Sequence, residues 1–229
     1  MGALDGLTFS NTLMFEQCLG WDGLLIEANP KSFEKLKENR PCAVNIGAAA
    51  CRVSDGPLRI AGAEGVATIL QDGKDNVADS VEIQCRPLSQ MLEENGIDRI
   101  NFFSLDVEGA ELQVLNTLDW DKVKIDVLMV EAEFVFNAQK DSDKVNEKIQ
   151  AVRDFVTANG MMQVRSRLDR DVDPATGKEK DTKLCQRNGY SDEKNCMFLS
   201  VAGSDVFVSP ELYEYDTKPW LYEEDTIEK

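Results

Sequence analysis

The stretch Phe102–Leu115, FFSLDVEGAELQVL, changes from an apolar run to an acidic turn and then to an amphipathic pattern. The apolar residues Ile100–Leu105 predict a buried strand, because short uninterrupted apolar runs are typical of parallel sheets. Ala110, Val114 and Leu118 follow at the i, i+4 spacing of a helix that buries one face. A strand that leads directly into a helix is typical of a βαβ unit and therefore predicts an α/β fold.

The same alternation of apolar runs and helical patterns continues on both sides of this stretch. Expected strands are Leu24–Ile26, Ala43–Ile46, Ile125–Val130, Met161–Val164 and Met197–Val201. Expected helices run from Ser10 or Asn11 to Leu19, from Asn29–Pro30 onward, from Leu88 to about Gly96 and from Ser142 to Asn159. Between Ser54 and Cys85 the glycines predict β-hairpin pieces. The whole pattern predicts a largely parallel sheet with helices around it.

Charge and composition exclude several classes of protein. The chain has 42 acidic and 25 basic residues and a formal net charge of −17. Binding to nucleic acid or anionic lipid requires basic side chains, so we expect neither partner. The apolar runs, such as Val127–Val130, are far shorter than the ~20 residues of a membrane-spanning helix. We therefore expect a soluble protein without a membrane span. The cytoplasm is the default location, and the lumen of the secretory pathway is the alternative.

The absence of histidine restricts the chemistry. No His occurs in the chain, which excludes every His-dependent catalytic triad and the commonest transition-metal ligand. A general base must then be a carboxylate or, as a weaker alternative, a Lys, Tyr or Cys.

The six cysteines include no CxxC pair, so zinc and thioredoxin-like sites are not expected. Most have apolar neighbours and are expected to be thiols of the core. Cys185 and Cys196 flank a polar segment and could pair in an oxidising compartment, whereas a chain without disulfides is the expectation in the cytosol.

Two features near the N-terminus suit an adenosine-containing cofactor. Gly2–Gly6 is a turn of small residues that allows the backbone to approach a ligand. Glu27 follows the strand Leu24–Ile26, where an acidic residue can accept hydrogen bonds from a ribose diol. The alternative is that Glu27 merely begins a loop. A GxGxxG pattern is absent, which counts against NAD or FAD.

Acidic residues also follow two further strands. Asp106, Glu108 and Glu111 come after Leu105, and Glu131 and Glu133 come at the end of the next expected strand. Crowded carboxylates raise one another's pKa, which suits a general base. They could also hold Mg²⁺ or Ca²⁺, because these ions prefer oxygen ligands. We expect Glu111 to face solvent on its helix, and we assign no metal ligand.

These segments together resemble the FkbM-family methyltransferases, including the eukaryotic branch related to the Star protein. The matching pieces are GALDGLTFSNT (Gly2–Thr12), GWDGLLIEANP (Gly20–Pro30), FFSLDVEGAELQVL (Phe102–Leu115) and IDVLMVEAEF (Ile125–Phe134). They span Gly2 to about Phe134, and in this order and spacing they are strongly specific.

The resemblance implies a Rossmann-like methyltransferase fold, a mostly parallel seven-stranded sheet with helices on both faces. It also implies S-adenosyl-L-methionine as the cofactor and a hydroxyl of a sugar or other small molecule as the substrate. Carried over to this sequence, the cofactor-binding residues are Gly2, Asp5, Glu27, Asn29 and Asp106.

The role of catalytic base falls on Asp106 or Glu108, with Glu131 or Glu133 as a second choice. The alternative function is a non-catalytic binding or scaffold module in secretory trafficking, as for Star-related proteins. Oligomeric state does not follow from the resemblance.

The family places a hydrophobic strand before the GALDG-like turn, whereas Met1 stands here where that strand should end. The resemblance therefore predicts a truncated first strand. We expect an FkbM-like domain over residues 1–203 and an acidic, aromatic C-terminal tail over residues 204–229.

Overall fold

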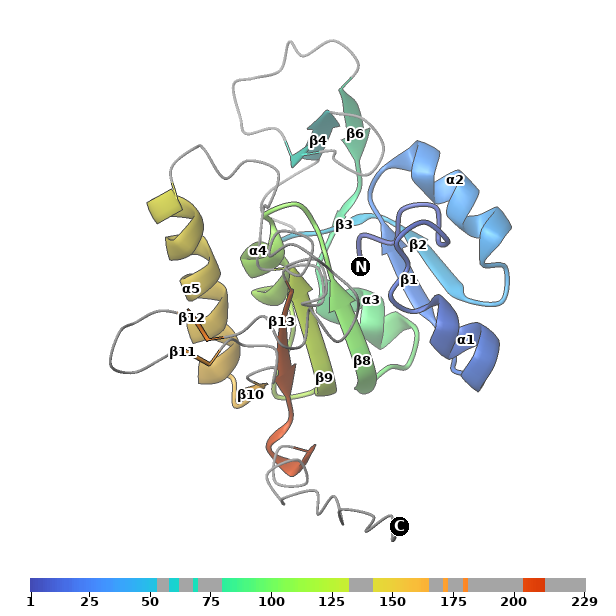
Figure 1. Ribbon diagram of the computed structural model, residues 1–229. Coiled ribbons are helices and arrows are strands. Elements are labelled where there is room, and N and C mark those ends of the chain that lie inside the picture. Colours follow the sequence, from blue (N-terminus) through green and yellow to red (C-terminus); the bar gives the residue numbers. More distant parts are fainter. Residues whose placement is uncertain are drawn as a thin grey trace, which may run out of the picture.

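The computed structural model describes residues 1–52, 58–61, 68–69, 80–131, 142–164, 171–172, 179–180 and 204–212. Figure 1 shows how these helices and strands are arranged. The strand expected at Met197–Val201 and the pair Cys185 and Cys196 lie outside the described residues. None of the helices in the described ranges is long and apolar enough to cross a lipid bilayer.

The largest sheet has four strands in the order β10-β13-β9-β8. β8 (Arg99–Leu105) and β9 (Lys124–Glu131) are parallel, and Leu105 pairs with Val130. β13 (Ser204–Val208) runs antiparallel between β9 and β10 (Met162–Val164). The sheet thus includes five residues that were expected to belong to the C-terminal tail.

The remaining strands form smaller sheets. β1 (Leu24–Glu27) and β2 (Val44–Gly47) are parallel, with Glu27 opposite Gly47. The other sheets are the pair of β3 (Ala49–Ala50) and β7 (Cys85–Arg86), the order β5-β4-β6 built from Thr68–Ile69, Leu58–Ala61 and Val81–Ile83, and the pair of β11 (Asp171–Val172) and β12 (Glu179–Lys180). The expectation of one mostly parallel seven-stranded sheet is therefore wrong for the described residues, because the strands form separate short sheets and β13 is antiparallel.

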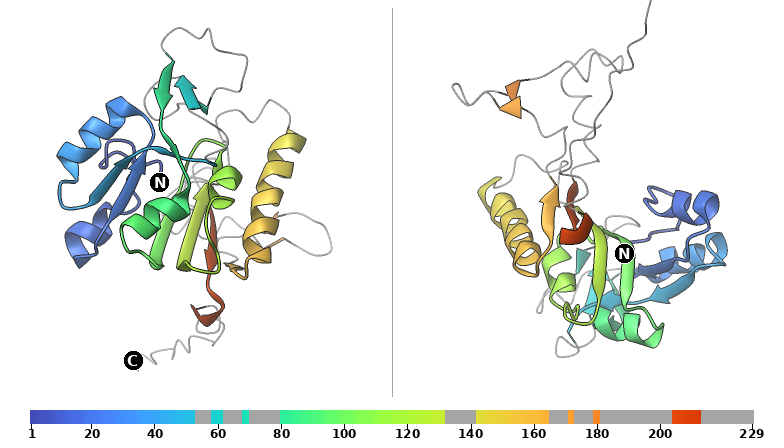
Figure 2. Two further views of the ribbon diagram at one scale, coloured as in Figure 1. Left: turned by 180° about the vertical axis from the view of Figure 1, so that it is seen from behind. Right: turned by 90° about the horizontal axis from the view of Figure 1, so that it is seen from below.

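These strands are accompanied by the helices α1 (Leu13–Leu19), α2 (Pro30–Asn39), α3 (Leu88–Glu94), α4 (Glu111–Leu115) and α5 (Ser142–Ala158). Figures 1 and 2 show α5 at one side of the structure and α1 and α2 at the other, with β8 and β9 between them. The main core lies around β8 and β9 and includes the fully buried Leu115, Leu128 and Val130.

Two expected helix starts can be compared with the structure. Asn29 caps α2, because its side-chain oxygen accepts a hydrogen bond from the Lys31 N–H at 3.0 Å. The prediction for α1 is wrong, since the N-cap is Thr12 rather than Ser10 or Asn11. Because Thr12 makes no side-chain capping hydrogen bond, residue preferences for the N-cap do not predict where α1 begins.

The expectation that most of the cysteines are thiols of the core is wrong for the four that lie in the described ranges. Cys51, directly after β3, and Cys85 of β7 form a disulfide. The parallel pairing of β3 with β7 places Ala49 opposite Cys85, which brings the two cysteines together across 34 residues of sequence. Cys18 and Cys42 are free and exposed.

The N-terminal segment connects the two parallel sheet pieces. The N–H groups of Gly2 and Ala3 donate to the carbonyl of Ile26 in β1, at 3.1 and 3.2 Å. On the other side, the Met1 nitrogen donates to the Ser104 carbonyl at 2.6 Å, and the Asp106 N–H donates to the Met1 carbonyl at 3.2 Å. In the described part of the chain no strand precedes β1, and residues Met1–Ala3 lie between β1 and β8.

This connection requires glycine at position 2. Gly2 has a φ of +73°, and a Cβ added there would lie 1.7 Å from the Asp106 carbonyl oxygen. The neighbouring atoms of Asp106 belong to the backbone, so no flexible side chain could move aside to relieve the clash. The contact therefore fixes how closely the N-terminal turn approaches the end of β8.

We predict that Gly2→Ala destabilises the protein more than Gly20→Ala does. Gly20 has a similar φ of +68° but nothing within 4 Å of an added Cβ, so it serves as the matched control. Both variants carry the left-handed backbone cost of about 1–2 kcal/mol. Only Gly2→Ala adds a steric cost of about 1–3 kcal/mol. Urea denaturation measures both free energies of unfolding, and equal losses would contradict the close approach.

Candidate active site

Three carboxylates meet where β8 and β9 end. One oxygen from each of Asp106, Glu108 and Glu131 lies within 4.8 Å of the others. Asp106 and Glu108 follow β8, and Glu131 is the last residue of β9. Because Leu105 pairs with Val130, the parallel register brings the two strand ends to the same edge. The structure thus brings together three of the acidic residues singled out from sequence, and Glu133 lies outside the described residues.

The turn between β8 and α4 is held by an acidic residue whose environment differs from the expected one. Glu111 is buried, with 6% of its surface exposed, and does not face solvent. One of its carboxylate oxygens accepts hydrogen bonds from the N–H groups of Val107 at 3.2 Å and Gly109 at 3.0 Å. Glu108, between these donors, has a φ of +56°, a conformation that non-glycine residues rarely adopt. Glu111 therefore stabilises the strained turn that presents Glu108.

Burial and crowding raise the pKa of two acidic residues in this cluster. Burial, followed by the charges of Asp106, Glu108 and Glu111, raises the pKa of Glu131 to about 9. Burial and the charges of Asp106 and Glu111 also raise the pKa of Glu108. Oε2 of Glu131 is buried and has no hydrogen-bond partner within the described residues. At neutral pH Glu131 therefore retains its proton.

Glu27 lies at the end of β1 and is 9% exposed. Its two carboxylate oxygens accept hydrogen bonds from the N–H groups of Leu4, at 2.8 Å, and Asn29, at 2.7 Å. Burial outweighs these hydrogen bonds and raises the pKa of Glu27. Each carboxylate oxygen can accept more than one hydrogen bond, so acceptor capacity remains for a ligand.

Asp5 and Asn29 are both engaged in local structure. The Asp5 carboxylate accepts hydrogen bonds from the N–H groups of Leu7 and Thr8 and from the Thr8 hydroxyl, at 2.7–2.9 Å. Although partial burial acts in the opposite direction, these hydrogen bonds lower the pKa of Asp5. Asn29 caps α2 beside Glu27. Both residues border the N-terminal turn, and their contact with a cofactor stays a prediction.

Sequence reasoning missed Arg40, which positions the N-terminal turn. Arg40 is 1% exposed, and its guanidinium donates to the Gly6 carbonyl at 3.0 Å and the Ser10 hydroxyl at 3.2 Å. It also pairs with Glu16 at 2.7 Å, which compensates the buried charge. An arginine at the end of a polar helix usually faces solvent, so the sequence pattern offered no signal for this role.

The carboxylate oxygens at this edge suit two kinds of ligand. Glu27 offers a buried carboxylate to hydroxyl groups, and the three-carboxylate cluster offers oxygen atoms to a proton or to a hard divalent cation. The N-terminal turn joins the two, because Leu4 bonds to Glu27 and Gly2 contacts Asp106.

One comparison with known proteins gives a match. The family model described as Methyltransferase FkbM domain matches residues 1–161, which include all of the carboxylates above. The search of curated proteins and the search of solved structures found no match.

The raised pKa of Glu131 predicts a pH-dependent cost to stability. A carboxyl whose folded pKa lies above its unfolded value of 4.5 favours folding fully below pH 4.5 and loses that contribution as the pH rises toward 9. Glu131→Gln cannot lose a proton and should remove this component. We predict that the variant gains stability relative to wild type between about pH 5 and 9, measured by thermal melts with a chelator present. Parallel pH profiles of the two proteins would contradict the assignment.

Proposed function

The chain belongs to the FkbM methyltransferase family, and on that premise we propose that it transfers a methyl group from S-adenosyl-L-methionine to a hydroxyl oxygen of a sugar or other small molecule. The observation that carries the proposal is the convergence of the N-terminal turn, Glu27 and the three-carboxylate cluster at one edge of the strands. Ligands of open α/β sheets bind at the carboxyl ends of the strands, where these groups lie.

The residues at this edge suit the proposed cofactor. Glu27 is buried and has lone pairs left for a ribose diol. Gly2, Asp5, Asn29 and Asp106 are the other proposed cofactor contacts. S-adenosyl-L-methionine would supply an activated methyl group on a positively charged sulfonium, and nearby carboxylates favour binding of such a charge.

The acceptor hydroxyl needs a group that takes its proton. An alcohol is a poor nucleophile at neutral pH, so a carboxylate within hydrogen-bond reach assists as the oxygen attacks. We assign this role to Asp106 or Glu108, because both belong to the three-carboxylate cluster. The carboxylate would take the proton of the hydroxyl as its oxygen bonds to the methyl carbon, and the bound donor would lose its carbon–sulfur bond and leave as S-adenosylhomocysteine. The rest of the catalytic effect comes from holding the two reactants in line.

The buried Glu131 supports the assignment of Asp106 or Glu108 as the base. With its proton retained at neutral pH, Glu131 lowers the total negative charge of the cluster. Asp106 is the exposed member and is therefore accessible to a substrate. A non-catalytic binding module of the Star-related kind would not need such a set of carboxylates, so the enzyme is the function we favour.

We predict that Glu27→Gln weakens binding of S-adenosylhomocysteine. Loss of a charged acceptor should cost about 1.5–3 kcal/mol, or roughly a 10- to 150-fold rise in Kd. Isothermal titration calorimetry measures the effect, and Glu34→Gln, an exposed change on α2, is the control. Because the new amide nitrogen cannot accept a hydrogen bond from Leu4 or Asn29, a thermal melt must show that the variant remains folded. Unchanged affinity in a folded variant would remove Glu27 from the site.

We predict that Asp106→Asn or Glu108→Gln lowers turnover by about 10²–10⁴-fold, because the proton acceptor is removed. A screen of hydroxyl-bearing acceptors with radiolabelled methyl donor identifies the substrate, and initial rates then compare the variants. Glu93→Gln, at an exposed position of α3, is the control. Full activity in both variants would overturn the assignment. Activity abolished by chelator and restored by Mg²⁺ would instead give these carboxylates a metal-binding role.

A further inference from the structure

A small three-stranded sheet projects from the edge that carries the candidate active site. The sheet β5-β4-β6, here named the arm, is built only from residues that lie between Cys51 and Cys85 in the chain. Leu58 pairs with Ile83 and Ile60 with Val81 across β4 and β6. Figure 1 shows β4 and β6 beyond the upper ends of β1 and β8, on the side where the N-terminus lies. The arm therefore lies beyond the strand ends that carry the groups assigned to cofactor and substrate.

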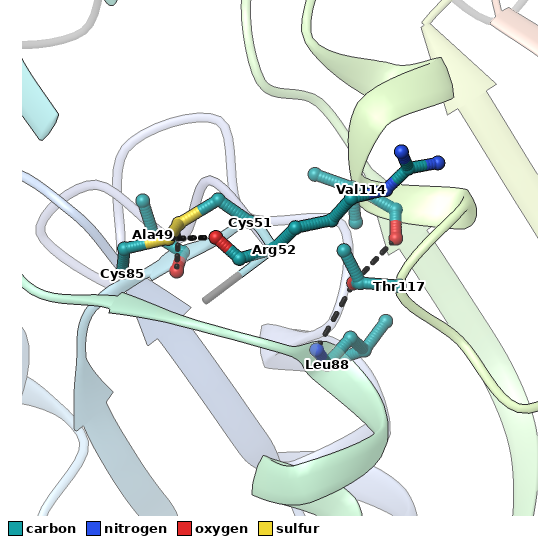
Figure 3. The surroundings of a disulfide bond; sticks show 7 residues. All are labelled: Ala49, Cys51, Arg52, Cys85, Leu88, Val114 and Thr117. Carbon is teal, nitrogen blue, oxygen red and sulfur yellow. Dashed lines mark hydrogen bonds between the residues drawn. A yellow bond between two sulfur atoms is a disulfide. The ribbon is translucent and has the colours of Figure 1, made fainter. Parts of the chain in front are cut away.

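The disulfide closes the base of this arm. Cys51 directly follows β3 and Cys85 belongs to β7, and these two strands form a parallel pair. Next to the bond, the Ala49 N–H donates to the Gln84 carbonyl at 2.9 Å, and the Cys51 N–H donates to the Arg86 carbonyl at 3.1 Å. Figure 3 shows the sulfur–sulfur bond crossing between the two strands. The bond thus joins the chain where it enters the arm to the chain where it leaves.

Two sets of contacts link the base of the arm to the candidate site. Cys51 is buried, at 5% exposure, in a small apolar cluster with Ile60 and Ile83 of the arm, and Ala28 packs against that cluster directly after Glu27. On the other strand, β7 leads into α3, where the Leu88 N–H donates to the Thr117 hydroxyl at 3.0 Å. That hydroxyl donates to the Val114 carbonyl of α4 at 2.7 Å (Figure 3).

We propose that Cys51 and Cys85 form a thiol–disulfide clamp that holds the arm in place and sets the affinity of the neighbouring cofactor site. The second part rests on the proposed function, whereas the first does not. Closure removes two electrons and two protons from the two thiols. A small-molecule disulfide such as glutathione disulfide accepts them and leaves as two thiols. The clamp is therefore closed in an oxidising compartment and open in a reducing one.

The physical basis is the restriction of the arm by a covalent loop. Cross-linking residues 34 apart in sequence removes conformations from the opened segment and favours the packed arm. The strands of the arm are short, and its apolar cluster has only four buried members among the described residues, Ala49, Cys51, Ile60 and Ile83. An element with so little buried apolar surface opens readily unless it is tied at its base.

The test uses the full chain with Cys18→Ser, Cys42→Ser, Cys185→Ser and Cys196→Ser, so that only Cys51 and Cys85 can exchange with glutathione. The protein is equilibrated with reduced or oxidised glutathione, treated with iodoacetamide and digested briefly with trypsin. Mass spectrometry follows alkylation of Cys51 and Cys85 and cleavage after Arg59 in β4. A variant with Cys51→Ala and Cys85→Ala reports the open clamp without any reductant.

In oxidised glutathione we expect Cys51 and Cys85 to resist alkylation, and we expect cleavage after Arg59 to be at least about tenfold slower than in the reduced protein. The double alanine variant should be cleaved at the fast rate in both buffers. Alkylation of both cysteines in oxidised glutathione, or equal cleavage rates with the bond formed, would overturn the clamp.

Calorimetry with S-adenosylhomocysteine tests the link to the site. We expect the reduced protein to bind at least about threefold more weakly than the oxidised protein, because an ordered site costs less to occupy. Equal affinities would contradict the link. If neither form binds, the proposed function fails, and the cleavage rates alone decide whether the clamp exists.

Discussion

The candidate site depends on one close approach, that of the Gly2 backbone to the carbonyl of Asp106. The N-terminal turn lies between β1 and β8 and bonds to Ile26 on one side and to Asp106 on the other. Through Leu4 it also fixes the carboxylate of Glu27. Two sheet pieces that share no ladder hydrogen bonds among the described residues are thereby held at the spacing that brings Glu27 and the three-carboxylate cluster to one edge. Arg40 supports the far end of the same turn from a buried position.

The chemistry of that edge follows from its crowding. Burial and the negative charges of its neighbours raise the pKa of Glu131 to about 9, so Glu131 keeps its proton at neutral pH. Glu111 serves a different purpose, because its hydrogen bonds to the turn hold Glu108 in a rare backbone conformation. Strain of this kind persists only where surrounding contacts enforce it. Four acidic residues near the ends of β8 and β9 thus differ in burial and in hydrogen bonding. Such differences suit a site that transfers a proton better than a patch of charges exposed to solvent.

Much of this arrangement is predictable from sequence, and the failures share a cause. The strands around Leu25, Ile46, Leu105 and Val130 appear as apolar runs, so local pattern alone locates them within one or two residues. β13 falls in the expected tail although Val206–Val208 is an apolar run, because its pairing with β9 joins residues more than seventy positions apart. The Cys51–Cys85 bond and the contacts of buried Arg40 depend on the same kind of distant partner. Sequence spacing indicates which acidic residues lie near strand ends, whereas their burial, which sets their pKa and their partners, depends on the fold.

Amide hydrogen exchange, measured with and without S-adenosyl-L-methionine, tests the central claim that this one edge binds the methyl donor. We predict slower exchange on binding in peptides that cover residues 1–10, 24–31 and 104–111, because these carry the N-terminal turn, Glu27 and the turn after β8. Peptides from α5 should be unaffected, since α5 lies beyond β9, on the side away from β1 and the N-terminus (Figure 1). Protection centred elsewhere, or no protection at saturating concentrations of the donor, would contradict the claim.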